Sequence, residues 1–375
     1  MAKQKKTKLR RKRNGRSSTP SHSKRDLVEV QRETLHLLAH QKRLLSAKLQ
    51  RRAIEKCVIV KGDACKKLPG DGKEVNVDCS SIHTPSVRIV DQDCLDVALE
   101  MQEALSDKEA TGSEGTLGGV TGKKGYRKVK VAVLVHGSGE NPGGGYKRGA
   151  NGQEEAICRR TNLAACVEAA SYPLPEFGCL YVPSLYVIRG GSNQDFKVYS
   201  RPRELSAVVA HCYMHMNTTS EGRIEPKYEA KTYAKIVNLL TCLAIHGHTD
   251  IVLGAWGCGA YGNPPLEIAR LFKKALTSHP RLSKNICFRN IVFAILKNRR
   301  AIEDFKNVFG EGLVPANSMK SSSMESQNRI RVSETSSSNG TQSIQQEVGD
   351  SKDEVECSKG TILATSKKSV PLEDL

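Results

Sequence analysis

The sequence predicts an α/β fold in which a mixed, largely parallel sheet carries helices on both faces. Apolar runs such as Val129 to Val135 and Thr249 to Leu253 are typical of buried strands. Each run leads into a glycine-rich loop and then into an apolar pattern of helical period, and this alternation of strands and helices favours a layered domain. Hydrophobic residues make up 38% of the chain, which is enough for a core in part of its 375 residues but low if all of them folded.

The chain divides by composition into three parts. Residues 1–25 contain eleven Lys and Arg and no acid, so they cannot bury a core and are expected to form a basic disordered tail. A folded domain is expected over residues 26–311, with residues 106–124, rich in Gly, Thr, Glu and Lys, as a surface insertion. Residues 312–375 are rich in Ser, Asn and Gln and contain no aromatic residue, which predicts a second disordered tail.

The elements of the folded domain follow from the periodicity of apolar residues. Helical spacing from Asp26, the expected N-cap, to about Lys56 predicts one long amphipathic helix with basic residues on its outer face, and a coiled coil or a nucleic-acid-binding helix is the alternative. Further helices are expected from Asp93 or Cys94 through Leu105, from Gln153 through Val167, over 228–246 and over 265–277. Strands are expected over 86–90, 129–135, 177–187, 205–213, 249–253 and 288–296, with short strands and a turn within 57–77 and a loop over 218–227.

The stretch from Asn141 to Thr161 is the centre of the predicted site. Three consecutive glycines, Gly143, Gly144 and Gly145, leave the backbone amides open to another molecule, and Gln153, Glu154 and Glu155 then begin a helix. Bare amides before a helix start bind anions, because N–H groups and the helix dipole point at the ligand. Two acids at the same helix start are either capping residues or the acids of a hydrolytic site.

A second glycine loop, Gly254 to Pro265, follows the strand over 249–253 and again leads into a helix. A single loop of this kind is often only a tight turn. Ligands of open α/β sheets bind at the carboxyl ends of strands, so two such loops predict one binding site at that edge.

Here the sequence resembles a known family. Gly-Gly-Gly, seven residues and Gln-Glu-Glu resemble the signature of the poly(ADP-ribose) glycohydrolase macrodomains, and Gly254 to Pro265 resembles the phosphate loop of their microbial branch. The similarity extends from about Arg25 to about Phe309. It implies a three-layer α/β/α macrodomain. One departure is that Val135 to Glu140 replaces the family's Asn-Phe-Ala-like run.

The resemblance implies a glycosidase that hydrolyses ribose–ribose O-glycosidic bonds of poly(ADP-ribose) and releases ADP-ribose. It implies that Glu155 is the general acid that protonates the leaving ribose oxygen, while Glu154 holds ribose hydroxyls or the leaving group. Neighbouring residues of a helix point about 100° apart, so the two acids are expected to have different roles. A water near the substrate diphosphate completes the reaction, and neither a metal nor a cofactor is required.

The resemblance also implies the substrate contacts. Asp93 is the candidate for the adenine amino group, although a helix cap explains it equally well, and Asn141 is expected at the distal ribose. Tyr261 is expected against the distal ribose, with core packing as its alternative. The expected amide donors to the diphosphate are in the two loops, and the loop residues assigned to binding are Gly143, Gly144, Gly145, Gln153, Gly257, Cys258, Gly259 and Ala260. Trp256 is expected to be a packing residue.

Charge and cysteine content bound the partners and the compartment. The net charge of +18 favours polyanions such as nucleic acid or poly(ADP-ribose), unless the basic tails alone carry the excess. The composition of residues 1–25 predicts a nuclear localisation signal, consistent with a role in the DNA damage response, or a nucleic-acid contact. The alternative is a solvated tail that no partner recognises. Twelve cysteines without a Cys-x-x-Cys pair indicate reduced thiols in an intracellular protein. Neither a membrane span nor a secretory signal is expected.

Three other functions remain open at this point. A non-catalytic reader of ADP-ribose would use the same loops, and a mono-ADP-ribosyl hydrolase would act on protein or nucleic acid. A nucleic-acid-binding protein would use residues 1–60. The pairs His211 with His215 and His246 with His248 invite a metal site, but ordinary loop or core histidines are the favoured interpretation.

Overall fold

The computed structural model describes residues 23–62, 85–110, 130–280, 282, 288–310 and 313. The chain separates into two units, Met1–Ser323 and Met324–Leu375, and every described residue lies in the first. Most of each predicted tail and most of the predicted insertion lie outside the described residues, but Lys24 and Arg25, which the sequence assigned to the N-terminal tail, belong to a helix. None of the helices in the described ranges combines the length and apolar character needed to traverse a bilayer.

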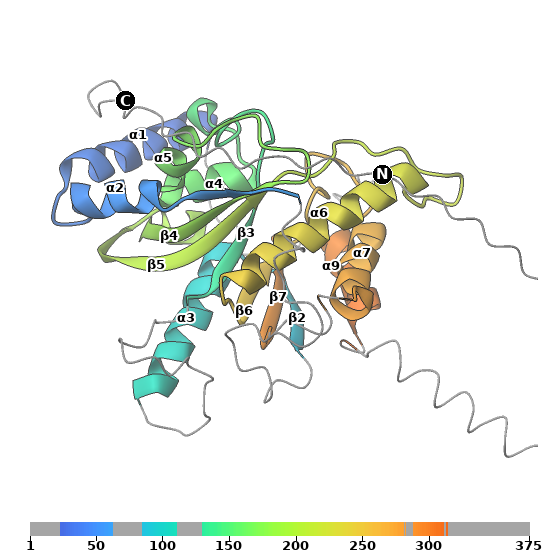
Figure 1. Ribbon diagram of the computed structural model, residues 1–375. Helices are drawn as coiled ribbons and strands as arrows, with labels where there is room; N and C mark the ends of the chain where they lie inside the picture. The colour runs from blue at the N-terminus through green and yellow to red at the C-terminus, as the bar shows by residue number, and fades with distance from the viewer. Residues whose placement is uncertain are drawn as a thin grey trace, which may run out of the picture. The chain divides into compact units, whose positions relative to one another are not determined.

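A seven-stranded mixed sheet organises the domain, in the order β1-β4-β5-β3-β6-β7-β2 (Figure 1). Its strands are β1 (Val58–Val60), β2 (Ser86–Val90), β3 (Ala132–His136), β4 (Cys179–Arg189), β5 (Val198–Ala210), β6 (Asp250–Leu253) and β7 (Asn290–Ala294). The pairs β5–β3, β3–β6, β6–β7 and β7–β2 are parallel, and β1–β4 and β4–β5 are antiparallel. The predicted mixed, largely parallel sheet is confirmed.

Helices cover both faces of this sheet. One face carries α6 (Pro226–Ile245), α7 (Pro265–Ser278) and α9 (Arg299–Phe309), and the other carries α3 (Cys94–Ala110), α4 (Gln153–Arg160) and α5 (Leu163–Glu168). Strand β3 shows the division, because Ala132 and Leu134 pack with the first group and Val133 and Val135 with the second. The predicted three-layer α/β/α architecture is confirmed, and Figure 1 shows α3 on the side of the sheet away from α7 and α9.

The predicted long helix over 26–56 is wrong, because two helices, α1 (Lys24–His40) and α2 (Ala47–Glu55), lie there side by side (Figure 1). Ser23, not Asp26, is the N-cap of α1, and Asp26 completes its capping box. Ser46 caps α2 by accepting a hydrogen bond from the N–H of Leu49 at 3.3 Å. The side-chain amide of Gln50 donates to the Leu38 carbonyl of α1 and to the Leu45 carbonyl of the connection. These bonds compensate for backbone hydrogen bonds that are lost where the helix is interrupted.

The helix that begins at Gln153 is shorter than predicted. It ends at Arg160 because the Thr161 hydroxyl donates to the Ile157 carbonyl and accepts from the N–H of Leu163, which starts α5 as a separate helix. Helix α9 was not predicted, although Asn298 caps it by accepting from the N–H of Ala301 at 3.1 Å. The remaining strands and helices agree with the prediction to within a few residues, except that β5 begins seven residues earlier, at Val198.

Candidate active site

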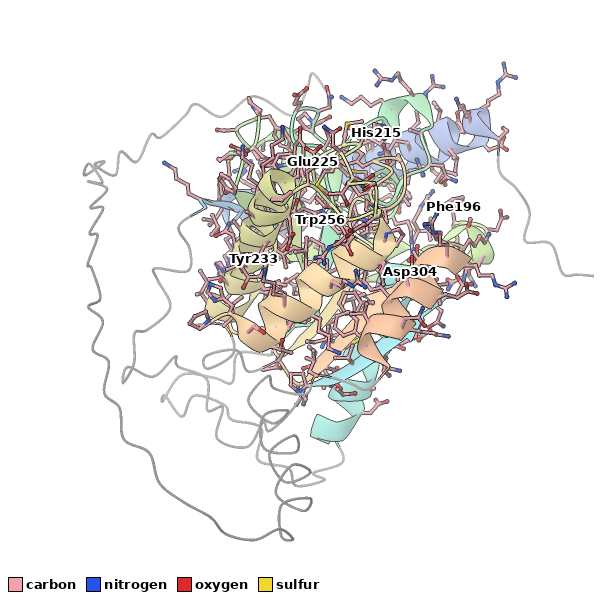
Figure 2. The ribbon with its side chains drawn as sticks, turned by 90° about the vertical axis from the view of Figure 1, so that its right-hand side faces the viewer. Phe196, His215, Glu225, Tyr233, Trp256 and Asp304 are labelled. Atoms are coloured by element: carbon pink, nitrogen blue, oxygen red, sulfur yellow. The ribbon has the colours of Figure 1, made fainter. Side chains whose placement is uncertain are left out.

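Three loops meet at the carboxyl edge of the parallel strands. They are residues 137–152 after β3, residues 211–217 after β5 and residues 254–264 after β6. The Ala210 carbonyl joins all three, because it accepts the N–H of Gly137 and the indole N–H of the buried Trp256, both at 3.0 Å. Trp256 is therefore a packing residue, as predicted, and Figure 2 shows it in the interior.

The Glu154 carboxyl is held by backbone N–H groups of the first loop. Its Oε2 accepts from Ser138 at 2.8 Å and its Oε1 from Gly143 at 3.2 Å. The side chain is 3% exposed, and this burial, together with the neighbouring charge of Glu155, raises its pKa to about 8 against the two N–H groups that lower it. Glu154 is therefore a carboxyl that keeps its proton near neutral pH.

The Glu155 carboxyl lies over the glycines and is partly exposed. Its Oε1 accepts from the N–H of Gly145 at 2.9 Å. Gly144 has a φ of +60°, and a Cβ at this position would lie 2.6 Å from Oε1 of Glu155. A Cβ at Gly152 would lie 2.3 Å from Oε2. The glycines are thus required for close packing of the carboxyl against the loop.

The amides of Gly143, Gly144 and Gly145, which the sequence predicts as donors to a diphosphate, have acceptors within the protein in this structure, and their contact with a diphosphate stays a prediction. Gly143 and Gly145 donate to the two acids, and Gly144 donates to the Asn141 carbonyl at 2.9 Å. The physical reason is that the α4 carboxyls, only a few residues away, are the nearest anions. The triglycine loop holds the acids, and Asn141 itself lies exposed at its tip.

The second loop keeps its amides available. Gly257, Gly259, Ala260 and Tyr261 donate no backbone hydrogen bond to any acceptor in the described part of the chain. A Cβ at Gly259 would meet no atom within 4 Å, so the space on the Cβ side of this residue is open. Cys258, by contrast, is buried and its N–H donates to Ala255 at 3.0 Å.

Tyr261 connects the two loops. Its hydroxyl interacts with the Ser138 side chain, and burial and then the charge of Glu154 raise its pKa. Its carbonyl accepts the N–H of His215 at 2.8 Å, which ties the second loop to the segment after β5. Figure 2 shows His215 at this edge of the domain. The structure therefore brings Tyr261 near Glu154 and Glu155, which are more than 100 positions away in the sequence.

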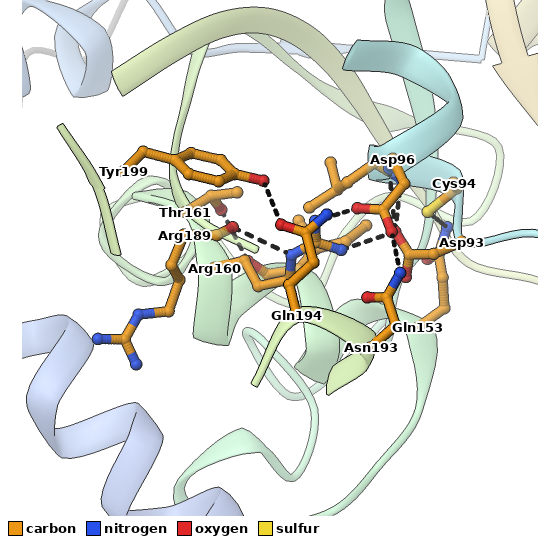
Figure 3. Close-up of polar contacts among 12 residues, drawn as sticks. Asp93, Cys94, Asp96, Gln153, Arg160, Thr161, Arg189, Asn193, Gln194 and Tyr199 are labelled. Carbon is orange, nitrogen blue, oxygen red and sulfur yellow. Dashed lines mark hydrogen bonds and ion pairs between the residues drawn. The ribbon is translucent and has the colours of Figure 1, made fainter. Parts of the chain in front are cut away.

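Gln153 and Asp93 have roles inside the protein. The Gln153 amide accepts from the N–H of His136 at 2.7 Å and donates to the Leu134 carbonyl at 2.8 Å, which fixes α4 to the end of β3. Asp93 accepts from the N–H of Leu95 at 2.9 Å and pairs with Arg160 at 2.7 Å (Figure 3). The structure shows the helix-cap contacts of Asp93 and the attachment of Gln153 to β3, and the predicted ligand contacts of both residues stay predictions.

The histidines have protein partners. The Lys235 ammonium donates to Nε2 of His211 at 2.8 Å, and burial lowers the pKa of Lys235 to about 8 and of His211 to about 4. His248 lies 2.8 Å from the Tyr181 hydroxyl, and His246 stacks on the same ring. Within the ranges that the structure describes, no three His, Cys, Asp or Glu side chains are grouped to hold a metal ion.

A family model described as microbial-type PARG, catalytic domain, matches residues 4–177. The resemblance predicted from the two loops is thereby confirmed. The match includes the first loop and both acids and ends before the second loop. A search of curated proteins finds no match.

Solved bacterial poly(ADP-ribose) glycohydrolases share the fold. The enzyme from Thermomonospora curvata is 20% identical with a TM-score of 0.56, and the alignment covers 76% of this chain and 100% of that chain. The same enzyme bound to the inhibitor ADP-HPD gives a TM-score of 0.54 at the same identity and coverage. The Deinococcus radiodurans enzyme in complex with ADP-ribose is 18% identical, with a TM-score of 0.51, and the alignment covers 70% of this chain and 97% of that chain.

Three residues that the PARG-like motifs do not include also build the site. Arg159 is 1% exposed and donates to the Ala150 carbonyl at 2.7 Å and to Oδ1 of Asn151 at 3.0 Å, which fixes the turn between the glycines and the acids. Arg160 is equally buried and pairs with two acids of the β2–α3 segment (Figure 3). Ser138 lies where the family motif differs, and its N–H binds Glu154. The only sequence signal was their position beside the motif.

Proposed function

We propose that the protein is a poly(ADP-ribose) glycohydrolase, a glycosidase that hydrolyses ribose–ribose O-glycosidic bonds and releases ADP-ribose. The observation that carries this proposal is the pairing of two glycine loops with different tasks. The first loop holds Glu154 and Glu155 through its N–H groups. The second loop presents open amides beside them, as a diphosphate requires. The family match and the shared fold support the same substrate, since two of the solved relatives bind ADP-HPD and ADP-ribose.

The proposed reaction divides the work between the acids. The Glu155 carboxyl, which is the more exposed of the two, donates a proton to the glycosidic oxygen as the bond from that oxygen to the anomeric carbon breaks. The positive charge that develops on the anomeric carbon is stabilised by the nearby substrate diphosphate. A water then adds to this carbon and returns a proton to Glu155, so one water is consumed for each ADP-ribose released.

Glu154 orients the substrate in this scheme. Its two oxygens are fixed by backbone N–H groups on either side of the acid pair, so it cannot swing toward the bond that breaks. With a pKa raised to about 8, the carboxyl carries a proton that it can donate to a ribose hydroxyl. Asn141 and Tyr261 border the same space and are proposed contacts of the distal ribose, while Gly257, Gly259 and Ala260 donate to the diphosphate.

The deciding experiment compares the wild type with Glu155→Gln on labelled poly(ADP-ribose). We expect the wild type to release ADP-ribose and the variant to lose at least about 100-fold in rate, since general acid catalysis contributes about 10²–10⁴-fold. The variant should still bind ADP-ribose. Glu140→Gln is the matched control, because Glu140 is an exposed acid of the same loop.

Two outcomes would reject the proposal. Unchanged polymer turnover by Glu155→Gln would show that another group supplies the proton. Binding of ADP-ribose without any product from the wild type would instead establish a non-catalytic reader.

The basic N-terminal segment supports a separate proposal, that residues 1–25 direct the protein to the nucleus, for a role in the DNA damage response, or contact nucleic acid. Its support is the run of eleven Lys and Arg, and the solved relatives, which are bacterial, add nothing to it. Deleting residues 2–22 should abolish nuclear accumulation of a fluorescent fusion and weaken salt-dependent DNA binding, without changing polymer cleavage. Accumulation in the nucleus without this segment would exclude the signal.

A further inference from the structure

Helix α2 presents an exposed cationic surface that the proposed catalysis does not use. A shallow hollow of about 600 Å³ lies on it, lined by Lys48, Arg51, Arg52 and Glu55. Between Lys42 and Lys56 the chain has six exposed Lys and Arg and a single acid. We call the three cations of the hollow, Lys48, Arg51 and Arg52, the α2 cluster.

The α2 cluster lacks the acidic partners that exposed cations have elsewhere in the domain. Across the described ranges, none of its three side chains forms an ion pair with an Asp or Glu. Exposed cations on the other helices and on β5 do form such pairs. These pairs are Arg203–Glu103, Lys231–Glu176, Arg270–Glu267, Lys274–Glu229, Arg299–Glu303 and Arg300–Asp304. Glu55 is the one acid in the hollow, so a net positive charge remains at α2.

The arrangement opposes helix stability. Lys48 is three residues before Arg51 and four before Arg52, and Lys56 follows Arg52 by four, so like charges are neighbours on the helix surface. The first turn of α2 contains no acid to match the helix dipole. Each unfavourable pair destabilises the helix, and a bound polyanion would remove this repulsion.

The α2 cluster is firmly attached to the catalytic part of the domain. Ala53 of α2 is 1% exposed, and Gln50 hydrogen-bonds to the Leu38 carbonyl of α1. The Thr34 hydroxyl of α1 in turn donates to the Arg159 carbonyl of α4 at 2.6 Å. Helices α1 and α2 therefore form a fixed support on the helix that carries the acids, and Figure 1 shows the three helices together at one side of the sheet.

We propose that the α2 cluster is a second binding site for poly(ADP-ribose), which holds units of the polymer beyond the one being cleaved; this inference rests on the proposed function. Arg side chains bind phosphate oxygens through paired N–H groups, and the polymer carries two phosphates in each unit. Leu49, which is 42% exposed and three residues before Arg52 on the helix, offers an apolar contact for a base beside the cluster. We favour the polymer over nucleic acid because the support on α4 links this surface to the site that already takes the polymer, and two linked contacts gain avidity.

The test is the triple variant Lys48→Glu, Arg51→Glu and Arg52→Glu. The matched control reverses Arg299, Arg300 and Lys306, three exposed cations of α9 on the opposite face of the sheet. The two variants have the same net charge, so a difference between them reports position and not total charge. All six residues are exposed, and thermal unfolding checks that both variants fold.

We expect KM for long polymer to rise at least about ten-fold at 50 mM salt in the α2 variant only. Its kcat, its KM for a two-unit oligomer and its Kd for ADP-ribose should equal those of the wild type. Three phosphate contacts to a flexible strand give a salt slope of about 2, so binding through the cluster should weaken about twenty-fold between 50 and 200 mM salt, and a ten-fold difference in KM at 50 mM should vanish by 200 mM.

An unchanged KM for long polymer in the α2 variant, or an equal rise in the α9 control, would overturn the inference. Loss of duplex DNA binding with an unchanged polymer KM would also overturn it and would assign the surface to nucleic acid. Failure of the proposed function is recognised separately, because the wild type would then release no ADP-ribose from any polymer.

Discussion

Replacing Glu154 by Gln should destabilise the protein, although the change only exchanges an oxygen for an amide nitrogen. Both carboxyl oxygens accept a backbone N–H, at 2.8 Å from Ser138 and 3.2 Å from Gly143. In either orientation of a Gln side chain, its NH₂ group would face one of these two donors. A carboxyl, protonated or not, keeps lone pairs on both oxygens and avoids this conflict.

The size of the effect follows from burial. Glu154 is 3% exposed, so water cannot replace the lost acceptor, and an unsatisfied buried donor costs about 1–3 kcal/mol. For a domain of this size, each kcal/mol corresponds to about 2–4 °C in Tm. Glu155 differs, because only one of its oxygens accepts an N–H and the side chain is partly exposed. Its Gln variant can keep that contact and should change Tm by less than about 2 °C.

The assay is thermal unfolding of the wild type, Glu154→Gln, Glu155→Gln and the control Glu140→Gln at pH 7. The expected order places Glu154→Gln several degrees below the other three. An unchanged Tm for Glu154→Gln, or a larger loss for Glu155→Gln, would refute the interpretation that Glu154 is the fixed acid and Glu155 the free one.

Three further predictions concern the same loop. The folded protein keeps the Glu154 proton up to about pH 8, whereas the unfolded chain loses it above about pH 4.5. The free energy of unfolding, measured with urea, should therefore fall as pH rises from 6.5 to 8. This pH dependence should vanish in Glu154→Gln. Arg159→Lys should lower kcat about ten- to hundred-fold and shift the pH–rate profile, while the Kd for ADP-ribose stays the same. The reason is that the loop that holds Glu155 loses the two hydrogen bonds that the Arg159 guanidinium donates to it. Equal losses in Kd and kcat would contradict this. Gly144→Ala should lose activity and about 1–2 kcal/mol of stability, since its φ of +60° is unfavourable with a Cβ that would also strike Glu155, and normal turnover would show that the loop can rearrange.

The sequence was sufficient for the sheet and for the location of the site. Short continuous apolar runs such as 249–253 are typical of strands buried on both faces, so they predicted the sheet. Parallel strands bring their carboxyl ends to one edge, which predicted the location of the site. The helix breaks were harder to predict, because Ser46 and Thr161 interrupt patterns whose apolar spacing continues past them. Their hydroxyls compete for backbone partners, and this competition is decided by the packing of neighbouring elements.

The contacts inside the site depended on distances that the sequence does not contain. Arg160 follows the acid pair and would be expected at the surface, yet it is 1% exposed because Asp93 and Asp96, more than sixty positions away, pair with it. The hydrogen-bond acceptors of the loop amides could not be predicted for the same reason. A bare glycine loop predicts available donors, but whether those donors serve a ligand or the protein depends on where the α4 carboxyls lie.

N–H groups of the first loop donate to carboxyls of the protein itself, which explains why a second glycine loop is needed. An N–H that donates to a carboxyl is not available to a phosphate, and the first loop gives the N–H groups of Gly143 and Gly145 to Glu154 and Glu155. Without those contacts the two neighbouring carboxyls would have no fixed positions. A single loop therefore cannot both hold the acids and bind the diphosphate. The second loop, whose Gly257, Gly259 and Ala260 amides donate to no acceptor in the described part of the chain, is the proposed source of the phosphate donors, and Tyr261 of this loop lies near the acids. Disrupting either loop should thus affect different steps, turnover for the first and substrate binding for the second.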